Sequence, residues 1–126
     1  MKLHSSIAAG LLSITSYDAV HIAVNGRRLT QSFILTPQRL IEDWPPKSFD
    51  GLSAPDLLAI AELDCPIVLL GTGARQRFPA PALLRPLLER RIGVEVMDSH
   101  AACRTYNILM AEGRAVVAAL IIESGG

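Results

Sequence analysis

The sequence predicts an α/β domain in which strands and helices alternate over the second half of the chain. Residues 67–70 form a continuous apolar run, which is typical of a strand buried on both faces of a sheet, and residues 94–97 predict a second buried strand. Between them lie leucines at helical spacing, over residues 83–92. Because a strand, a helix and a strand in series need a crossover connection, we expect parallel pairing in a layered sheet.

The composition fits one folded domain, residues 1–126, and excludes several classes of function. Half of the 126 residues are hydrophobic and 19% are charged, which is incompatible with an intrinsically disordered chain. Twelve basic residues balance twelve acidic ones, so the chain lacks the net positive charge of a general nucleic-acid or membrane-surface binder. Aromatic residues make up only 5%, too few for a base-stacking surface. We therefore expect no nucleic-acid partner.

The first third of the chain has the pattern of β structure. Residues 12–17 and 20–24 alternate apolar and polar side chains, as strands with one buried face do. Asn25-Gly26 follows, the pair that best accepts the two positive φ angles of a type I′ hairpin turn. The return strand is expected over residues 28–35.

Prolines and capping residues set the boundaries of the middle segment. Two prolines within residues 43–48 exclude regular structure there, so this segment is predicted to join a β part to an α/β part. Ser53 and Asp56 form a capping box, which predicts a helix from residue 53 to about residue 63. Gly93 is expected to close the next helix in the C′ position, where a left-handed residue is favoured.

A third helix and a last strand complete the predicted fold. The helix is expected to begin at Asp98 or Ser99 and to end at Gly113, and the strand to cover residues 115–122. The apolar run of that strand is too short to span a bilayer. The N-terminal apolar stretch, residues 7–12, is not followed by a clear cleavage site, so we expect no signal peptide.

Cysteine and histidine positions predict no metal site and no cofactor. Cys65 and Cys103 are too few for a disulfide scaffold or a structural zinc site, so we expect two free thiols in a reducing compartment, the cytoplasm. The histidines, His4, His21 and His100, lack the spacing of metal ligands. His21 falls on the polar face of its strand and is expected to be exposed.

The first candidate site is Gly71-Thr72-Gly73, which follows a buried strand. Glycines at such a place let backbone N–H groups approach an anion, as phosphate-binding loops do. The third glycine of a dinucleotide-binding fingerprint is missing, because Gln76 stands there, and no Gly-Lys-Ser/Thr sequence follows. The alternative is a tight turn that needs a positive φ angle. The sequence leaves both interpretations open.

The second candidate site is the polar first half of the third helix. Cys103 lies beside Arg104 near the helix N-terminus, which favours a lowered thiol pKa and a thiolate nucleophile. The alternative is structural. In that interpretation Asp98 or Ser99 caps the helix, Cys103 packs as a small apolar residue, and Arg104 and Asn107 bind neighbouring carbonyls.

These two segments predict one pocket, because each follows a buried strand and the carboxyl ends of neighbouring parallel strands meet at one sheet edge. In that pocket Arg104 would offer positive charge, and Arg104 and Thr105 would offer hydrogen-bond donors, to a small anion or to a carboxylate of a partner. The candidate pocket residues are Gly71, Thr72, Gly73, Asp98, Cys103, Arg104, Thr105 and Asn107. A basic stretch between the segments is either a solvated helix face or an anion-binding patch, and it contains Arg75, Arg77, Arg85, Arg90 and Arg91.

The same segments carry a family resemblance that covers nearly the whole chain. The matching stretches are residues 69–73, 78–79, 93–98, 101–109 and 112–114, preceded by Asn25-Gly26-Arg27 and Trp44-Pro45. Together they resemble the family called domain of unknown function 498, or Mth938-like, whose members include a mitochondrial complex I assembly factor and an adipogenesis-associated protein. The resemblance implies a compact three-layer β/β/α domain without known catalytic activity, and it carries over no active-site residues.

The predicted function is a non-enzymatic binding or assembly module that resembles the respiratory complex I assembly factors, with proteins of membrane-complex assembly as its partners. The alternative is a small-anion-binding protein, or an enzyme that uses Cys103, with its pocket at the carboxyl ends of the strands.

Overall fold

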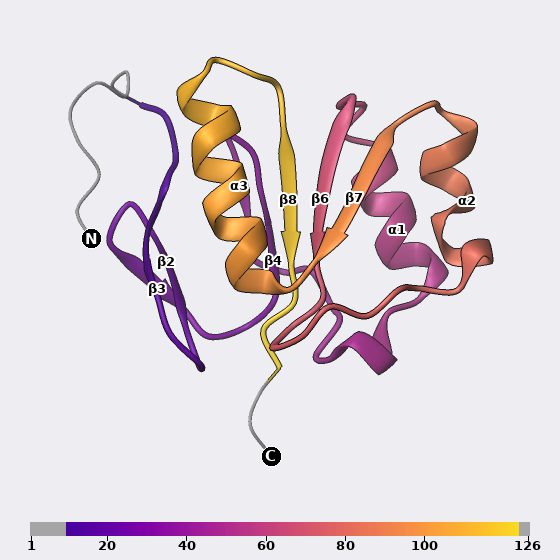
Figure 1. The fold of residues 1–126 in the computed structure, drawn as a ribbon, viewed down its shortest axis with the longest axis horizontal. Helices are drawn as coiled ribbons and strands as arrows, with labels where there is room; N and C mark the ends of the chain where they lie inside the picture. Colours follow the sequence, from indigo (N-terminus) through magenta and orange to yellow (C-terminus); the bar gives the residue numbers. More distant parts are fainter. Residues whose placement is uncertain (1–9, 124–126) are drawn as a thin grey trace.

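The computed structural model describes residues 10–123, which form two β-sheets and three α-helices (Figure 1). The smaller sheet has the order β1-β2-β3, with β1 at Ile14–Tyr17, β2 at Ile22–Val24 and β3 at Arg27–Leu29. The larger sheet has the order β5-β4-β8-β6-β7, with β4 at Phe33–Leu35, β5 at Leu40–Ile41, β6 at Ile67–Gly71, β7 at Gly93–Met97 and β8 at Val117–Leu120. The helices are α1 at Ala54–Ala61, α2 at Pro81–Glu89 and α3 at Ser99–Ala111, with a 3₁₀ turn η1 at Phe49–Gly51.

The centre of the larger sheet contains the predicted parallel crossovers. Strand β6 pairs in parallel with β7 on one side and with β8 on the other, whereas β4 is antiparallel to both β8 and β5. Helix α2 connects β6 to β7, and α3 connects β7 to β8. β7 and β8 lie on opposite sides of β6. The crossover from β6 to β7 and the crossover from β7 to β8 therefore run in opposite directions along the sheet, which places α2 and α3 on opposite faces.

Side chains of the larger sheet alternate between two apolar cores. Val68 and Leu70 pack with α1 and α2, whereas Leu69 packs with α3 and the smaller sheet. Figure 1 shows α1 and α2 on one side of the larger sheet, and α3 beside the smaller sheet on the other. The predicted layered α/β fold is confirmed. One outer layer combines α3 with the smaller sheet, and the other contains α1 and α2.

Three of the predicted boundaries are confirmed by their cap or turn geometry. Ser53 and Asp56 form the reciprocal capping box that begins α1. Gly113 ends α3 with a φ of 79°. Asn25 and Gly26 have φ angles of 47° and 86°, as a type I′ turn requires.

The predicted return strand over residues 28–35 was wrong, because it is two strands in two different sheets. β3 ends at Leu29, and β4 begins at Phe33 and pairs with β8. Between them Ser32 is buried, and its hydroxyl accepts a hydrogen bond from Ile122 N at 3.0 Å. β3 leaves Arg27 and Arg28 exposed, whereas all three residues of β4 are buried, so the two halves of the predicted strand lie in different environments.

The predicted C′ role of Gly93 was also wrong. Arg91 adopts the left-handed conformation after α2, with a φ of 58°, and Gly93 already belongs to β7. Gly93 N donates to Pro66 O at 2.9 Å, which continues the pairing of β7 with the start of β6. The helix therefore ends earlier than the glycine indicated.

None of the helices in residues 10–123 is both long enough and apolar enough to cross a bilayer. His4 and part of the apolar stretch at residues 7–12 lie outside the described residues.

Candidate functional site

The carboxyl ends of β6 and β8 meet the first turn of α3 at one edge of the larger sheet. Ser99 N donates to Gly73 O at 2.9 Å, and Gly73 N donates to Ser99 Oγ at 2.9 Å. The Ser99 hydroxyl in turn donates to Ile121 O at 2.7 Å. The loop after β6 and the start of α3 are therefore in direct contact.

Both glycines of the loop are explained by close packing. A Cβ atom on Gly71 would lie 2.9 Å from Ser99 Cα, closer than side chains approach a backbone. Gly73 has a φ of 98°, and a Cβ atom there would collide with the carboxylate of Glu123. The first glycine lets α3 approach β6, and the second permits a left-handed turn.

Thr72 fastens this loop from inside. Its side chain is fully buried, and Oγ1 donates to Arg75 O at 2.6 Å and accepts from Arg77 N at 3.1 Å. Thr72 N donates to Met97 O at 2.9 Å. The N–H groups of Thr72 and Gly73 thus already donate within the protein, which is the geometry of the tight-turn interpretation rather than that of an open anion cradle.

Cys103 faces the core. It is fully buried among apolar side chains below α3, and burial raises the pKa of its thiol to about 12. Asp98 accepts a hydrogen bond from Ala101 N at 2.8 Å and caps the helix. A thiolate nucleophile needs the opposite environment, accessible and electropositive. Cys103 and Cys65 are both free thiols, as expected.

The other candidates on α3 fasten the helix to the smaller sheet. Arg104 is exposed, and its guanidinium donates to Tyr17 Oη at 2.9 Å. The amide of Asn107 accepts from Ile14 N at 2.9 Å and donates to Ile14 O at 2.8 Å, as a neighbouring strand would. Thr105 lies half-buried in the same part of α3. The sequence-predicted set is therefore divided, with four residues at the strand ends and four further along α3.

A pocket of about 170 Å³ does lie at the predicted sheet edge. Gly73, Ala74 and Ser99 form one side of it, and the turn between β1 and β2 forms the other. The sequence did not single out its ionisable residues for this place, and these are Asp18, His21, His100 and Glu123.

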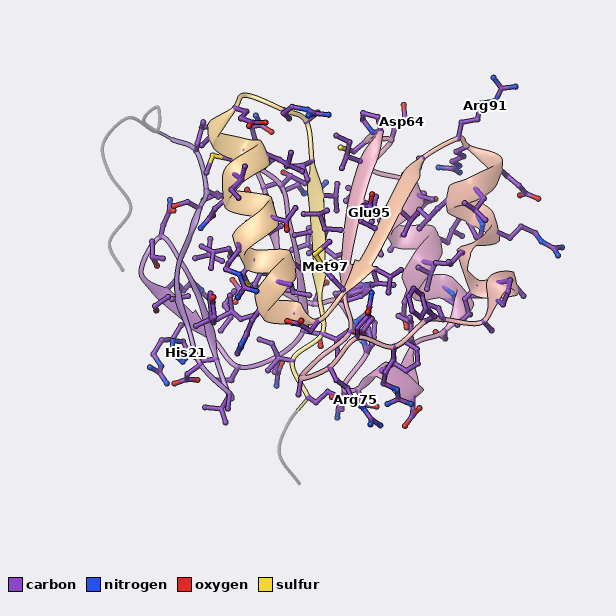
Figure 2. The ribbon with its side chains drawn as sticks, in the orientation of Figure 1. His21, Asp64, Arg75, Arg91, Glu95 and Met97 are labelled. Atoms are coloured by element: carbon purple, nitrogen blue, oxygen red, sulfur yellow. The ribbon has the colours of Figure 1, made fainter. Side chains whose placement is uncertain are left out.

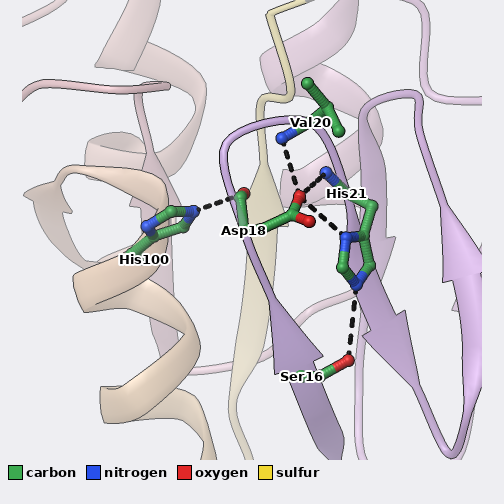
Figure 3. Close-up of polar contacts among 5 residues, drawn as sticks. All are labelled: Ser16, Asp18, Val20, His21 and His100. Carbon is green, nitrogen blue, oxygen red and sulfur yellow. Dashed lines mark hydrogen bonds and ion pairs between the residues drawn. The ribbon is translucent and has the colours of Figure 1, made fainter.

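Asp18 organises the turn between β1 and β2 (Figure 3). Its Oδ1 accepts from Val20 N and from His21 N, each at 2.9 Å. The Nδ1 atom of His21 lies 2.7 Å from the same oxygen, although without the alignment of a hydrogen bond. The Val20 N–H bond, followed by the His21 contacts, lowers the pKa of the Asp18 carboxyl. An aspartate whose side chain accepts hydrogen bonds from the N–H groups two and three residues later forms an Asx-turn. The aspartate at position 18 is therefore the sequence signal that indicates this turn.

The predicted exposure of His21 was wrong, because the residue is only 6% exposed. β2 begins one residue later, at Ile22, and the preceding turn directs the imidazole inward, with Nε2 3.4 Å from Ser16 Oγ. His100 closes the turn from α3, since its Nε2 lies 2.9 Å from Asp18 O and its ring packs 4.3 Å from that of Tyr17.

The basic stretch does not form one continuous patch. Arg77 binds Asp50 at 2.7 Å and lies over the Phe49 ring, and Arg90 donates to Ala61 O at 2.8 Å. Figure 2 shows Arg75 near the carboxyl ends of the strands and Arg91 beyond the far end of α2. Within residues 10–123, no group of three His, Cys, Asp or Glu side chains is placed to hold a metal ion.

Comparison with known proteins identifies the family. A model described as "Protein of unknown function (DUF498/DUF598)" matches residues 14–121. The chain belongs to this family. NADH dehydrogenase (ubiquinone) 1 alpha subcomplex assembly factor 3 of Bos taurus is 37% identical over 115 residues, which are 90% of this chain and 62% of that relative. The chain thus spans about three fifths of the length of this curated relative.

Solved structures of two bacterial relatives share the fold. A crystal structure of a Bordetella parapertussis protein is 41% identical with a TM-score of 0.85, covering 92% of this chain and 99% of that one. The solution structure of a Bordetella pertussis protein, described as a Mth938-like domain, is 35% identical with a TM-score of 0.84, covering 100% and 95%. The family and the fold class predicted from the sequence are both confirmed.

Proposed function

We propose that this chain is a binding module that acts in the assembly of the respiratory NADH dehydrogenase, complex I. The observation that carries the proposal is the 37% identity to a complex I assembly factor across 90% of the chain. The partners would be subunits or other assembly proteins of that membrane complex, and the compartment we propose is the cytoplasm.

The strand-end loop and α3 support a binding role more than a chemical one. The Thr72 hydroxyl donates to Met97 O on β7, the Ser99 hydroxyl donates to Ile121 O, and the Asn107 amide donates to Ile14 O. These polar groups hold the layers together and are not free to act on a substrate. Such internal hydrogen bonds keep the protein rigid, and a rigid surface that presents side chains to a partner loses less conformational entropy on binding.

Deletion of the gene in the organism that encodes this chain tests the assembly role. The amount of fully assembled NADH dehydrogenase in native gels of its membranes should fall, while an unrelated complex such as ATP synthase should stay unchanged. Re-expression of the chain should restore the assembled complex. An unchanged amount of assembled NADH dehydrogenase in the deletion strain would overturn the proposal.

Two exposed apolar side chains provide a matched pair of surface variants. Phe78, before α2, is 73% exposed, and Ile108, on α3, is 60% exposed. Aromatic side chains are the commoner anchors of protein interfaces, so Phe78→Ser should restore less assembled complex than the wild type. Ile108→Ser, on the other outer layer, is the control and should restore it fully. Thermal unfolding of both variants checks that each keeps its fold.

The alternative, an enzyme or anion-binding protein that uses Cys103, has its own test. Alkylation of the native chain by iodoacetamide at pH 7 should modify half-buried Cys65 and leave buried Cys103 unmodified, with both reacting after denaturation. Rapid modification of native Cys103 with a pH midpoint below that of an ordinary thiol would instead favour the enzyme.

A further inference from the structure

Strand β7 leaves one edge of the larger sheet open. It is the last strand in the order of that sheet and pairs only with β6 (Figure 1). Gly93 N donates to Pro66 O, and Met97 O accepts a hydrogen bond from the loop after β6. Because alternate residues of a strand direct their backbone groups to opposite sides, those of Val94 and Val96 point away from β6. An open edge of this kind is a template for a further strand.

Three of the outward backbone groups of β7 have no hydrogen-bond partner among residues 10–123. These are the N–H and the C=O of Val94 and the N–H of Val96. The C=O of Val96 is occupied, since it accepts from Gln76 Nε2 at 2.8 Å. Ile92, directly before β7, has the reverse arrangement, because its N–H donates to Leu87 O at 3.0 Å and its C=O has no partner in the described chain.

A second copy of β7, antiparallel to the first and centred on Val94, matches these free groups. Val94 of each copy would face Val94 of the other, which gives two hydrogen bonds about a two-fold axis. Val96 would face Ile92 of the second copy, where its free N–H would donate to the free C=O. The two groups that this pair leaves unused, Val96 O and Ile92 N, are those already bonded within each chain.

The charged side chains of the edge favour the same register. A pair centred on Glu95 would place two carboxylates directly opposite each other, which destabilises antiparallel strands. Centring on Val94 places Glu95 opposite Gly93 of the second copy, which has no side chain, and brings Arg91 of that copy to its diagonal. Glu95 and Arg91 are both exposed, and neither forms an ion pair within the described residues. A second copy would supply each with a partner of opposite charge.

The other face of β7 is apolar and incompletely covered. Val94 and Val96 are half-buried beside the core that α1 and α2 form with the larger sheet. In the register centred on Val94 they would pack against Val94 and Ile92 of the second copy, which removes apolar surface from water on both chains. We propose that β7 is a dimerisation edge, at which two copies of this chain join their larger sheets into one continuous sheet.

Substitution of Gly93 tests the edge by charge, because this residue is exposed and an added Cβ atom would lie 3.4 Å from its nearest neighbour, Pro66 O. In sedimentation equilibrium the wild type should reach twice the mass of one chain as its concentration rises. Gly93→Glu places a carboxylate opposite Glu95 of the second copy, and it should raise the dimer Kd about tenfold, since this contact occurs twice. Gly93→Lys places the opposite charge there and should dimerise at least as tightly as the wild type. Ala111→Glu, at the exposed end of α3, is the control and should leave Kd unchanged.

Amide hydrogen exchange identifies the edge that pairs. The amides of Val94 and Val96 should exchange more slowly as the chain concentration rises, whereas that of Glu95, which faces β6, should not change. Three results would overturn the proposal. These are a monomer at every concentration up to the millimolar range, which leaves the edge to a strand of another protein, equal weakening by Gly93→Glu and Gly93→Lys, and a dimer in which the Val94 and Val96 amides gain no protection. Because these measurements use the isolated chain, the dimer and the proposed assembly role can fail separately.

Discussion

The two outer layers of the molecule are held to the larger sheet by different forces. The layer of α1 and α2 is held by apolar packing, with Leu57, Ile60 and Leu87 fully buried against the side chains of β6. The layer of α3 and the smaller sheet also has an apolar core, but a row of polar contacts joins its two parts.

Those polar contacts join residues that are far apart in the sequence. The Tyr106 hydroxyl donates to Leu12 O at 2.7 Å, and the Asn107 amide pairs with the backbone of Ile14, across 94 and 93 positions. The contact of Arg104 with Tyr17 at the end of β1, and that of His100 with Asp18 in the turn that follows, extend the row. The layer of α1 and α2 thus follows from hydrophobic periodicity in the sequence, whereas the layer of α3 and the smaller sheet also depends on specific side-chain hydrogen bonds.

The largest effect should come from a cavity in the apolar layer. Leu57→Ala removes a fully buried side chain from α1, and we expect it to lower the free energy of unfolding by about 2–5 kcal/mol. Leu58→Ala is a matched control on the next residue of the same helix, where the side chain is 43% exposed, and should cost about 1 kcal/mol or less. Urea unfolding measures both. Similar losses in the two variants would contradict the view that packing holds this layer.

The seam between β6 and α3 should respond next. Gly71→Ala places a Cβ atom 2.9 Å from Ser99 Cα, and we expect a loss of about 1–3 kcal/mol because backbone must move. Gly93→Ala is the control, since its added Cβ would lie an acceptable 3.4 Å from Pro66 O. If Gly71→Ala proves as stable as Gly93→Ala in thermal unfolding, close approach does not explain the first glycine of the loop.

This difference between the layers also sets what the sequence could predict. Local signals identified the capping box of α1, the Asn25-Gly26 turn and the buried strand β6, because each is written within a few neighbouring residues. They placed the loop after β6 beside the start of α3, since parallel strands end at one edge of a sheet.

Residues whose role depends on distant partners were not predictable in the same way. Cys103 and Asn107 are four positions apart on α3, yet one faces the core and the other replaces a strand partner for Ile14. His21 lines the pocket because the turn around Asp18 directs it inward, and alternation alone assigned it to the exposed face. The Gly93 error has a different cause, since Arg91 adopts a left-handed conformation that is uncommon for non-glycine residues.

The polar row gives a third prediction. Asn107→Ala leaves the N–H and C=O groups of Ile14 without their side-chain partner, and we expect a loss of about 1–3 kcal/mol. Amide hydrogen exchange at Ile14 should accelerate more than exchange in α1, because the smaller sheet loosens from α3. Ile108→Ala, an exposed neighbour on α3, is the control and should change stability by about 0.5 kcal/mol or less. Uniform acceleration across both layers would contradict a local role for Asn107.

The smallest effect should come from the charge on Asp18, at the outer end of the polar row. Its side chain is half exposed, and its pKa is lowered by the Val20 N–H bond and by His21. The ionised carboxylate therefore contributes stability above the pKa of an ordinary aspartate, about 4, and that contribution is lost as the pH falls through the lower folded-state value. Asp18→Asn keeps the acceptor oxygen and removes the charge, so the Tm of wild type and variant should converge below about pH 4. The control is Asp43→Asn, at an exposed aspartate in the proline-containing segment, and its Tm should equal that of the wild type at every pH. If the Tm difference between the wild type and Asp18→Asn does not narrow in acid, the charge of Asp18 does not stabilise the turn.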